Sequence, residues 1–142
     1  MKVLFDTNVW LDIILGREGF LEASLTALYD CIDEGDDLCV AATSLKDVFF
    51  LVERLEGAET AYESVERMLQ LARPLAVDDA VCRRALLLER PDYEDGIVAA
   101  AAEAEQIECI VTRDEGAFLE LGIHRASPLE FIKERGAEIV SF

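Results

Sequence analysis

Residues 1–10 read M-K-V-L-F-D-T-N-V-W, and the polar triplet Asp6–Asn8 separates two apolar segments. Lys2–Phe5 has the length and apolar character of a short buried strand. Thr7–Leu15 has the spacing of a helix that buries one face and ends before a glycine. A carboxylate, a hydroxyl and an amide at this junction indicate a strand that ends at a functional edge of a sheet.

The alternation of short apolar segments with longer amphipathic ones continues along the chain. Strands are predicted at Lys2–Phe5, Leu38–Ala42, Pro74–Val77, Ile107–Val111 and Ile123–Ala126. Helices are predicted at Thr7–Leu15, Gly19–Glu34, Ser44–Leu55, Ala58–Ala72, Asp78–Glu89, Tyr93–Glu105, Glu115–Leu121 and Pro128–Arg135. Short apolar strands that alternate with helices are typical of a parallel sheet with helices on both faces. We therefore expect one α/β domain over residues 1–142.

Composition limits the class of protein. Hydrophobic residues make up 52% of the 142, which is enough for a substantial core. No segment approaches the roughly 18 uninterrupted apolar residues of a membrane span, and Asp6 interrupts the apolar stretch that a signal peptide would need. A cytoplasmic protein without a membrane segment is therefore expected.

Cysteine and histidine usage excludes the common zinc sites. The only histidine is His124, and no two of the four cysteines are spaced as C-x-x-C. Reduced, mostly buried thiols are the ordinary condition of such cysteines in a cytosolic protein. These cysteines are Cys31, Cys39, Cys82 and Cys109.

Acidic residues follow the predicted strands. Asp6 follows the first strand, Asp47 comes shortly after the second, and Asp114 comes after the fourth. Asp95 lies in the first turn of the helix Tyr93–Glu105. Because ligands of such folds bind beyond the carboxyl ends of the strands, these carboxylates are expected to converge there. The polar residues that accompany them are Thr7, Asn8, Ser44 and Thr112.

Each carboxylate also has an ordinary structural explanation. Ser44 as N-cap with Asp47, and Asp92 with Asp95, have the spacing of a capping box, and Asp114 could favour a helix N-terminus through the helix dipole. Capping needs no convergence, however, and carboxylates that share one pocket must raise their pKa values or bind a cation. A ligand set of oxygen alone suits Mg²⁺ or Mn²⁺, and a metal-bound water is the chemistry of phosphodiester hydrolysis.

Four segments resemble the acidic motifs of the PIN-domain family, and most closely those of the ribonuclease toxins of bacterial VapC-type toxin–antitoxin pairs. In chain order these segments are Phe5–Val9, Thr43–Asp47, Tyr93–Ile97 and Ile110–Asp114. The resemblance implies a three-layer α/β/α sandwich around a mostly parallel sheet of about five strands. It also implies cleavage of single-stranded RNA with Mg²⁺ or Mn²⁺, and an antitoxin protein as partner.

The resemblance assigns a role to each matching residue. Asp6, Asp95 and Asp114 would ligate the metal directly or through water, and Asp47 would help to hold or orient the metal and its water. The residues that would position carboxylates or a phosphate are Thr7, Asn8, Ser44 and Thr112. The second acidic position is more often Glu in the family, and Glu115–Phe118 also departs from the family pattern. One tightly held ion is therefore expected.

Other residues near these motifs have less specific patterns. Asp12 is expected to face solvent, and Lys46 is a candidate to neutralise the site or to contact a phosphate. The run Phe49–Val52 is too apolar for one helix face, so it could be core on one side and a homodimer surface on the other.

The net charge of −17 opposes RNA binding, because such a surface repels nucleic acid at long range. Weak, salt-sensitive binding is expected unless arginines form a local basic rim at the site. The candidate arginines are Arg83, Arg84, Arg90, Arg113 and Arg125.

Three other classes of protein are alternatives. A PIN-like protein that no longer cleaves would bind metal and act as a scaffold, although the complete acidic set argues against it. A haloacid-dehalogenase-type phosphatase would need D-x-D, and Asn8 stands where its second aspartate would be. A response-regulator receiver would need adjacent acidic residues after the first strand and a late lysine, whereas Thr112–Asp114 follows Val111 here.

Overall fold

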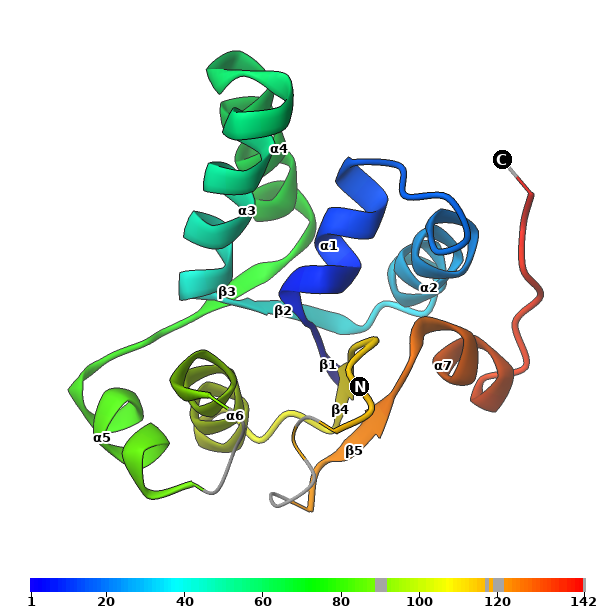
Figure 1. Cartoon of the computed structure of the whole chain (residues 1–142). Helices are drawn as coiled ribbons and strands as arrows, with labels where there is room; N and C mark the ends of the chain where they lie inside the picture. Colours follow the sequence, from blue (N-terminus) through cyan, green and yellow to red (C-terminus); the bar gives the residue numbers. More distant parts are fainter. Residues whose placement is uncertain (89–91, 117, 119–121, 142) are drawn as a thin grey trace.

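The computed structural model describes residues 1–88, 92–116, 118 and 122–141 (Figure 1). The strands in these ranges are β1 (Lys2–Phe5), β2 (Asp37–Ala41), β3 (Arg73–Leu75), β4 (Cys109–Val111) and β5 (His124–Ala126). The helices are α1 (Thr7–Ile14), α2 (Leu21–Asp33), α3 (Ala42–Glu56), α4 (Ala58–Leu71), α5 (Asp79–Leu87), α6 (Tyr93–Ala104) and α7 (Pro128–Glu134).

The five strands form one sheet in the order β3-β2-β1-β4-β5, and every neighbouring pair is parallel. The central strand is β1, and its Leu4 lies opposite Cys39 of β2 and Ile110 of β4. The two edge strands, β3 and β5, are only three residues long. Since all strands run the same way, the residues that follow β1, β2 and β4 lie at one edge of the sheet.

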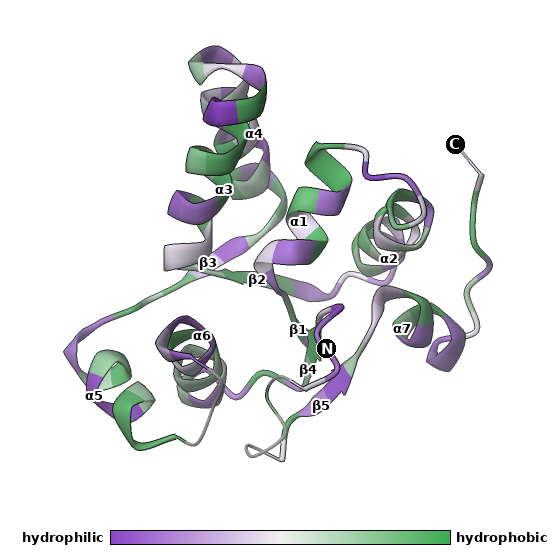
Figure 2. Ribbon diagram, viewed as in Figure 1, coloured by the Kyte–Doolittle hydropathy of each residue, from purple (hydrophilic) through white to green (hydrophobic). Residues whose placement is uncertain are grey.

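Helices cover both faces of the sheet, so the predicted three-layer α/β/α sandwich is confirmed (Figure 1). Figure 2 shows the central strands as largely hydrophobic, as expected for strands buried on both faces. Alternate residues of β1 point to opposite layers. Val3 and Phe5 pack with α1, α2, α3, α4 and α7, whereas Leu4 packs with α5 and α6.

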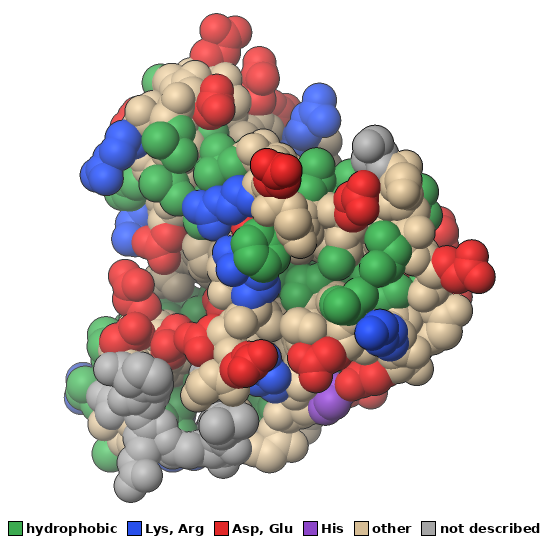
Figure 3. Space-filling view, turned by 45° about the vertical axis from the view of Figure 1, so that its right-hand side comes forward, with side chains coloured by type: hydrophobic (Ala, Val, Ile, Leu, Met, Phe, Trp, Pro, Cys, Tyr) green, Lys and Arg blue, Asp and Glu red, His purple; other side chains and the backbone are tan. Residues whose placement is uncertain are grey.

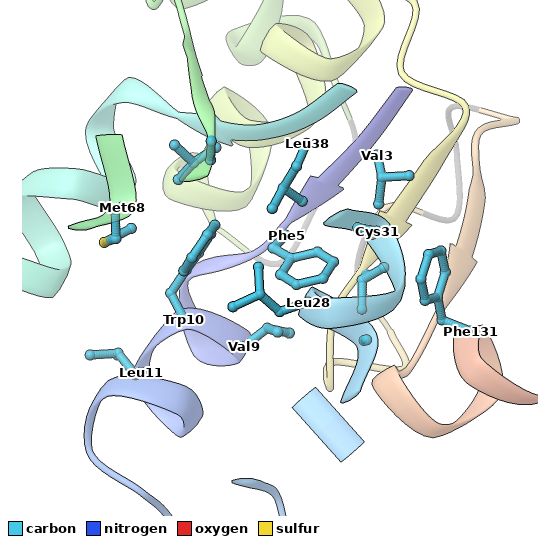
Figure 4. Packing of buried hydrophobic residues seen from close by; sticks show 14 of the residues in the cluster. Val3, Phe5, Val9, Trp10, Leu11, Leu28, Cys31, Leu38, Met68 and Phe131 are labelled. Carbon is cyan, nitrogen blue, oxygen red and sulfur yellow. The ribbon is translucent and has the colours of Figure 1, made fainter. Parts of the chain in front are cut away.

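The residue before the polar triplet is the centre of an aromatic cluster (Figure 4). Phe5 is fully buried, and its ring centroid lies 5.7 Å from that of Trp10 and 6.5 Å from that of Phe131. Both neighbouring rings are also buried. This packing fixes the end of β1 and the start of α1, and it thereby fixes the backbone of Asp6.

Small residues let α6 lie close to the sheet. Ala99–Ala102 are all buried and belong to the core layer that α6 shares with α5 and with Leu4 of β1. Gly96, one turn earlier, is buried as well. The close approach brings the first turn of α6, which contains Asp95, toward the carboxyl edge of the sheet.

Several predicted boundaries differ from the observed ones. The second strand begins at Asp37 because it pairs with Lys2 of β1, and β3 ends at Leu75, two residues earlier than predicted. The predicted N-cap role of Ser44 is wrong, because α3 begins at Ala42 and places Ser44 inside its first turn. In the predicted helix Glu115–Leu121, the described residues 115, 116 and 118 lie in turns, and residues 117 and 119–121 are outside the described ranges.

All four cysteines are unpaired, and three of them are buried. Cys82 is the partly exposed one. In the described ranges no helix is long and apolar enough to cross a membrane.

Candidate active site

A cleft of about 520 Å³ opens at the carboxyl ends of the central strands, between α1, the start of α3 and the start of α6. In the part of the chain that the structure describes, Lys46 is the only cationic side chain that lines it. The acidic side chains that line it are Asp6, Asp47, Glu94, Asp95 and Asp114. The cleft therefore concentrates negative charge at the edge where the sequence predicted it.

Asp6 lies at the floor of the cleft and is also the N-cap of α1. One carboxylate oxygen, Oδ1, accepts a hydrogen bond from the Thr7 amide at 2.8 Å, and the other, Oδ2, accepts one from the Thr112 hydroxyl at 2.8 Å. Its side chain is almost completely buried. The capping explanation and the functional explanation thus apply to the same carboxylate.

The Thr112 hydroxyl connects β1 to β4. It donates to Asp6 and accepts from the Asn8 Nδ2 at 3.2 Å and from the Asp114 amide at 3.1 Å. A hydroxyl has one donor and two acceptor positions, so its hydrogen-bonding capacity is fully used. Asn8 completes the connection, because its Oδ1 accepts from the Arg113 amide at 3.1 Å.

A second hydroxyl pair connects α1 to α3. The Thr7 hydroxyl donates to the Ser44 hydroxyl oxygen at 2.8 Å, and Ser44 is buried. The Ser44 side chain therefore connects two helices instead of capping one. Asp47 follows on the same helix, lines the cleft, and accepts a hydrogen bond from Lys46 at 2.9 Å.

Asp95 enters the cleft from α6. The N-cap of this helix is Asp92, whose carboxylate accepts a hydrogen bond from the Asp95 amide at 2.8 Å. The predicted Asp92–Asp95 cap is therefore present as a hydrogen bond to the backbone. It leaves the Asp95 carboxylate available to the cleft.

Two carboxylates in the cleft, those of Asp6 and Asp95, have raised pKa values. Burial raises the pKa of Asp95 to about 6, and repulsion from Asp92, Asp6 and Asp114 adds to this effect. Burial also raises the pKa of Asp6, against the opposing effect of the hydrogen bonds from Thr112 and Thr7. Asp6, Asp95 and Asp114 are therefore close enough to interact electrostatically.

The donor set fits a hard divalent cation. The three interacting aspartates offer oxygen alone, and a cation would relieve their mutual repulsion. No three His, Cys, Asp or Glu side chains in the described ranges form a ready-made ligand cluster. Because Mg²⁺ keeps several water ligands, this wide arrangement suits ligation partly through water.

Residues 2–116 match the family model of the PIN domain. The chain belongs to the PIN domain family.

Solved structures share this PIN fold along most of their length. A toxin–antitoxin complex from Klebsiella pneumoniae has a TM-score of 0.70 and 18% identity, covering 90% of this chain and 98% of the other. FitAcB from Neisseria gonorrhoeae has a TM-score of 0.66 and 22% identity, covering 89% and 97%. The sarcin-ricin loop cleaving toxin VapC20 from Mycobacterium tuberculosis has a TM-score of 0.67 and 15% identity, covering 85% and 95%. No curated protein matches the sequence.

The PIN fold brings most of the predicted site residues together in the cleft. Those that line it directly are Asp6, Thr7, Asn8, Asp47, Asp95 and Asp114. Ser44 and Thr112 are buried behind it and bind Thr7 and Asp6, respectively. Their positions agree with a supporting role.

The expectation that Asp12 faces solvent is wrong. Its side chain is completely buried in this PIN domain, and it forms ion pairs with Arg113 and Arg17. One signal in the sequence could have found it: Asp12 lies four residues after Asn8, so the two share a helix face.

None of the candidate arginines for a basic rim lines the described part of the cleft. Arg83 pairs with Asp79 and Arg84 pairs with Glu103. Arg113 pairs with Asp12, Arg125 contacts Glu130, and Arg90 lies outside the described residues. Figure 3 shows acidic side chains beside the hollow at the left of the molecule, with basic side chains scattered over the rest of the face.

Thr112→Val should weaken divalent metal binding by about 10–100-fold, the usual effect of removing a residue that orients a metal ligand. Valine keeps the volume and branching of threonine but loses all three hydrogen bonds of the hydroxyl. Titration of the purified variant with Mn²⁺ measures the effect. Thr112→Ser is the matched control because it keeps the hydroxyl, and equal weakening in both variants would contradict the proposed positioning.

The pH dependence of unfolding should report the raised pKa of Asp95. The folded protein holds this proton more tightly than the unfolded chain, since the pKa is about 6 when folded and 3.8 without perturbation. The Asp95 carboxylate therefore reduces stability as pH rises from about 4 to about 6. In EDTA, Asp95→Asn should gain thermal stability relative to the wild type over that range.

Asp37→Asn is the control for this measurement, because the Arg73 guanidinium lowers the pKa of Asp37. The ionised Asp37 stabilises the folded state, so its loss should have the opposite sign above pH 4. A difference between Asp95→Asn and the wild type that stays constant from pH 4 to 7 would show that Asp95 titrates normally.

Proposed function

We propose that this PIN domain is a metal-dependent endoribonuclease that hydrolyses phosphodiester bonds of single-stranded RNA, and that it is the cytoplasmic toxin of a toxin–antitoxin pair. The observation that carries the proposal is the convergence of Asp6, Asp95 and Asp114 in one cleft, where they interact electrostatically. The membership of the PIN domain family and the likeness to toxin structures support it.

The contacts support the proposed roles of the site residues. Asp6, Asp95 and Asp114 would hold Mg²⁺ or Mn²⁺, which when bound activates a water and stabilises charge on the leaving oxygen. Thr112 holds Asp6 and the amide of Asp114 in fixed positions. Asn8 holds the backbone of the same segment.

Asp47 and Lys46 occupy the α3 side of the cleft. Asp47 would orient the metal and its water, and Lys46 would contact a phosphate of the RNA. The Lys46 side chain is largely exposed, and its ammonium group lies 2.9 Å from Asp47. An exposed ion pair of this kind contributes little to stability, so Lys46 can exchange Asp47 for a phosphate at small cost.

RNA affinity is weak in this proposal for two reasons. The net charge is −17, and the described cleft lining contains a single cationic side chain. A homodimer is also proposed. Val52 is buried in the core, whereas Phe50 on the same helix is 57% exposed, which leaves an apolar surface on α3.

Cleavage of a fluorescent single-stranded RNA in Mn²⁺, Mg²⁺ and EDTA tests the proposal. We expect cleavage in either metal and none in EDTA. Asp79 is an exposed aspartate of α5 outside the cleft. Asp79→Asn is therefore the matched control for substitutions of the cleft aspartates, and it should cleave RNA like the wild type. Metal binding without cleavage would favour the scaffold alternative, and the absence of both would contradict a metal-dependent nuclease.

A further inference from the structure

Asp12 is a completely buried carboxylate to which the proposed reaction assigns no role. It lies on α1, next to Leu11 of the cleft lining, and its main partner is Arg113. The guanidinium Nε lies 2.5 Å from Asp12 Oδ2 and the Nη2 lies 3.1 Å from Oδ1, which is a two-pronged contact. Arg17 lies further away, with its Nη1 at 3.4 Å.

The Arg113 side chain also packs against an aromatic ring. Its guanidinium carbon lies 4.0 Å from the ring centroid of Phe20, the residue before α2, which is a cation–π contact. The backbone amide of Arg113 donates to the Asn8 side chain, one helical turn before Asp12. Residues of α1 thus hold Arg113 by its main chain and by its side chain.

Arg113 stands between two residues of the candidate site. Thr112 binds the Asp6 carboxylate, and Asp114 lines the cleft. On the β5 side, the Thr112 amide donates to the Ala126 carbonyl at 2.9 Å and Arg125 donates to the Asp114 carbonyl at 2.8 Å. Neither bond connects the segment Thr112–Asp114 to α1. The Asp12–Arg113 pair attaches this segment to α1, the helix that Asp6 caps.

Stability alone is a poor reason for such a pair. The Asp12 carboxylate is completely removed from water, whereas the Arg113 side chain stays 28% exposed. Burying such a charge costs free energy that its partner barely repays, and an apolar pair of similar volume is often as stable. What the two-pronged ion pair supplies is a defined geometry between the two elements that carry it.

We propose that the Asp12–Arg113 pair is a positioning device that fixes the Thr112–Asp114 segment against α1 and so sets the position of Asp114 relative to Asp6. Asp12 and Arg113 are positioning residues in this scheme, and they contact neither metal nor RNA. The predicted effect on metal affinity depends on the proposed function, whereas the effect on the segment itself does not.

The test compares wild type, Asp12→Asn, Arg113→Lys and the double variant. Arg113→Lys keeps the positive charge opposite Asp12 but loses the planar guanidinium. This variant should therefore stay folded while it loses the two-pronged contact. Each variant should weaken Mn²⁺ binding by about 10–100-fold. Because the two residues act as one unit, the double variant should bind Mn²⁺ about as tightly as the single variants do. The Mn²⁺ site is identified by its loss in Asp6→Asn.

Amide hydrogen exchange of the metal-free protein provides a second readout. The amides of Arg113 and Asp114 should exchange faster in the variants, and those of β1 should not change. The matched control is Asp36→Asn, because Asp36 is also a nearly buried carboxylate paired with an arginine, Arg135. Asp36 precedes β2, at the opposite edge of the sheet, so its loss should lower the melting temperature only.

The two readouts distinguish a failure of the proposed function from a failure of the positioning proposal. If wild type binds no Mn²⁺ at the cleft, the proposed function fails, and faster exchange at Arg113 and Asp114 in Asp12→Asn still supports the positioning role. If Asp12→Asn lowers the melting temperature as Asp36→Asn does and leaves these amides unchanged, the pair is only structural. Additive losses in the double variant, or an Arg113→Lys effect confined to the KM for RNA, would also overturn the proposal.

Discussion

Asp6→Asn should lower metal-dependent RNA cleavage by at least about 100-fold, the scale of losing one essential charged or polar group in an active site. Asparagine has the shape of aspartate but not its charge, so the cleft loses the carboxylate that contacts both Thr7 and Thr112. The rate of cleavage of a fluorescent single-stranded RNA in Mn²⁺ measures the loss.

The fold should survive this substitution. Asparagine caps helices about as well as aspartate does, and burial already disfavours the charged form of Asp6, whose pKa is raised. Asp78→Asn is the matched control, because Asp78 caps α5 through the Val81 amide and lies outside the cleft. Equal cleavage by wild type and Asp6→Asn would place the activity at another site or in a contaminant.

Phe5→Ala should destabilise the protein by about 3–5 kcal/mol, the usual cost of truncating a buried phenylalanine. The side chain is fully buried between Trp10 and Phe131, and its loss leaves a cavity that surrounding β1 and α1 cannot readily fill. The free energy of unfolding in urea, monitored by circular dichroism, measures the change.

Leu87→Ala is the control for this truncation, because the Leu87 side chain on α5 is 75% exposed and lies outside the α3 surface proposed for the homodimer. Its loss should change the free energy of unfolding by no more than about 0.5 kcal/mol. A comparable effect of the two substitutions would mean that Phe5 is not the packing centre that the structure indicates. A marginally stable domain has a total of only about 5–15 kcal/mol, so Phe5→Ala removes a large share of it.

The sequence predicts the first strand correctly because its signal is unusually clear. The apolar segment Lys2–Phe5 changes to polar residues at Asp6, and the strand ends there. The boundaries of the other strands depend on pairing with β1, as in the contact of Lys2 with Asp37, and local periodicity contains no such information. The α/β class, the three layers and the five parallel strands follow from the order of the elements.

The candidate site is predicted less completely than the fold. Asp6 and Asp114 come together because the carboxyl ends of parallel strands share an edge. Asp95 reaches the same cleft from the first turn of α6. The roles of Ser44 and Asp12 depend instead on distant partners. The Ser44 partner is Thr7, and the Asp12 partner is Arg113, 101 residues further along the chain. For Asp12, the sequence alone offers only the helix face that it shares with Asn8 as a sign of burial.

The sheet edges also determine how another protein can approach this domain. The edge strands β3 and β5 are three residues long, Pro74 in β3 has no amide hydrogen, and β5 begins with the exposed His124. Short edges with proline or polar residues resist the addition of a further strand. The proposed antitoxin or second copy is therefore expected to bind the helical surfaces, and edge-to-edge aggregation through the backbone is disfavoured.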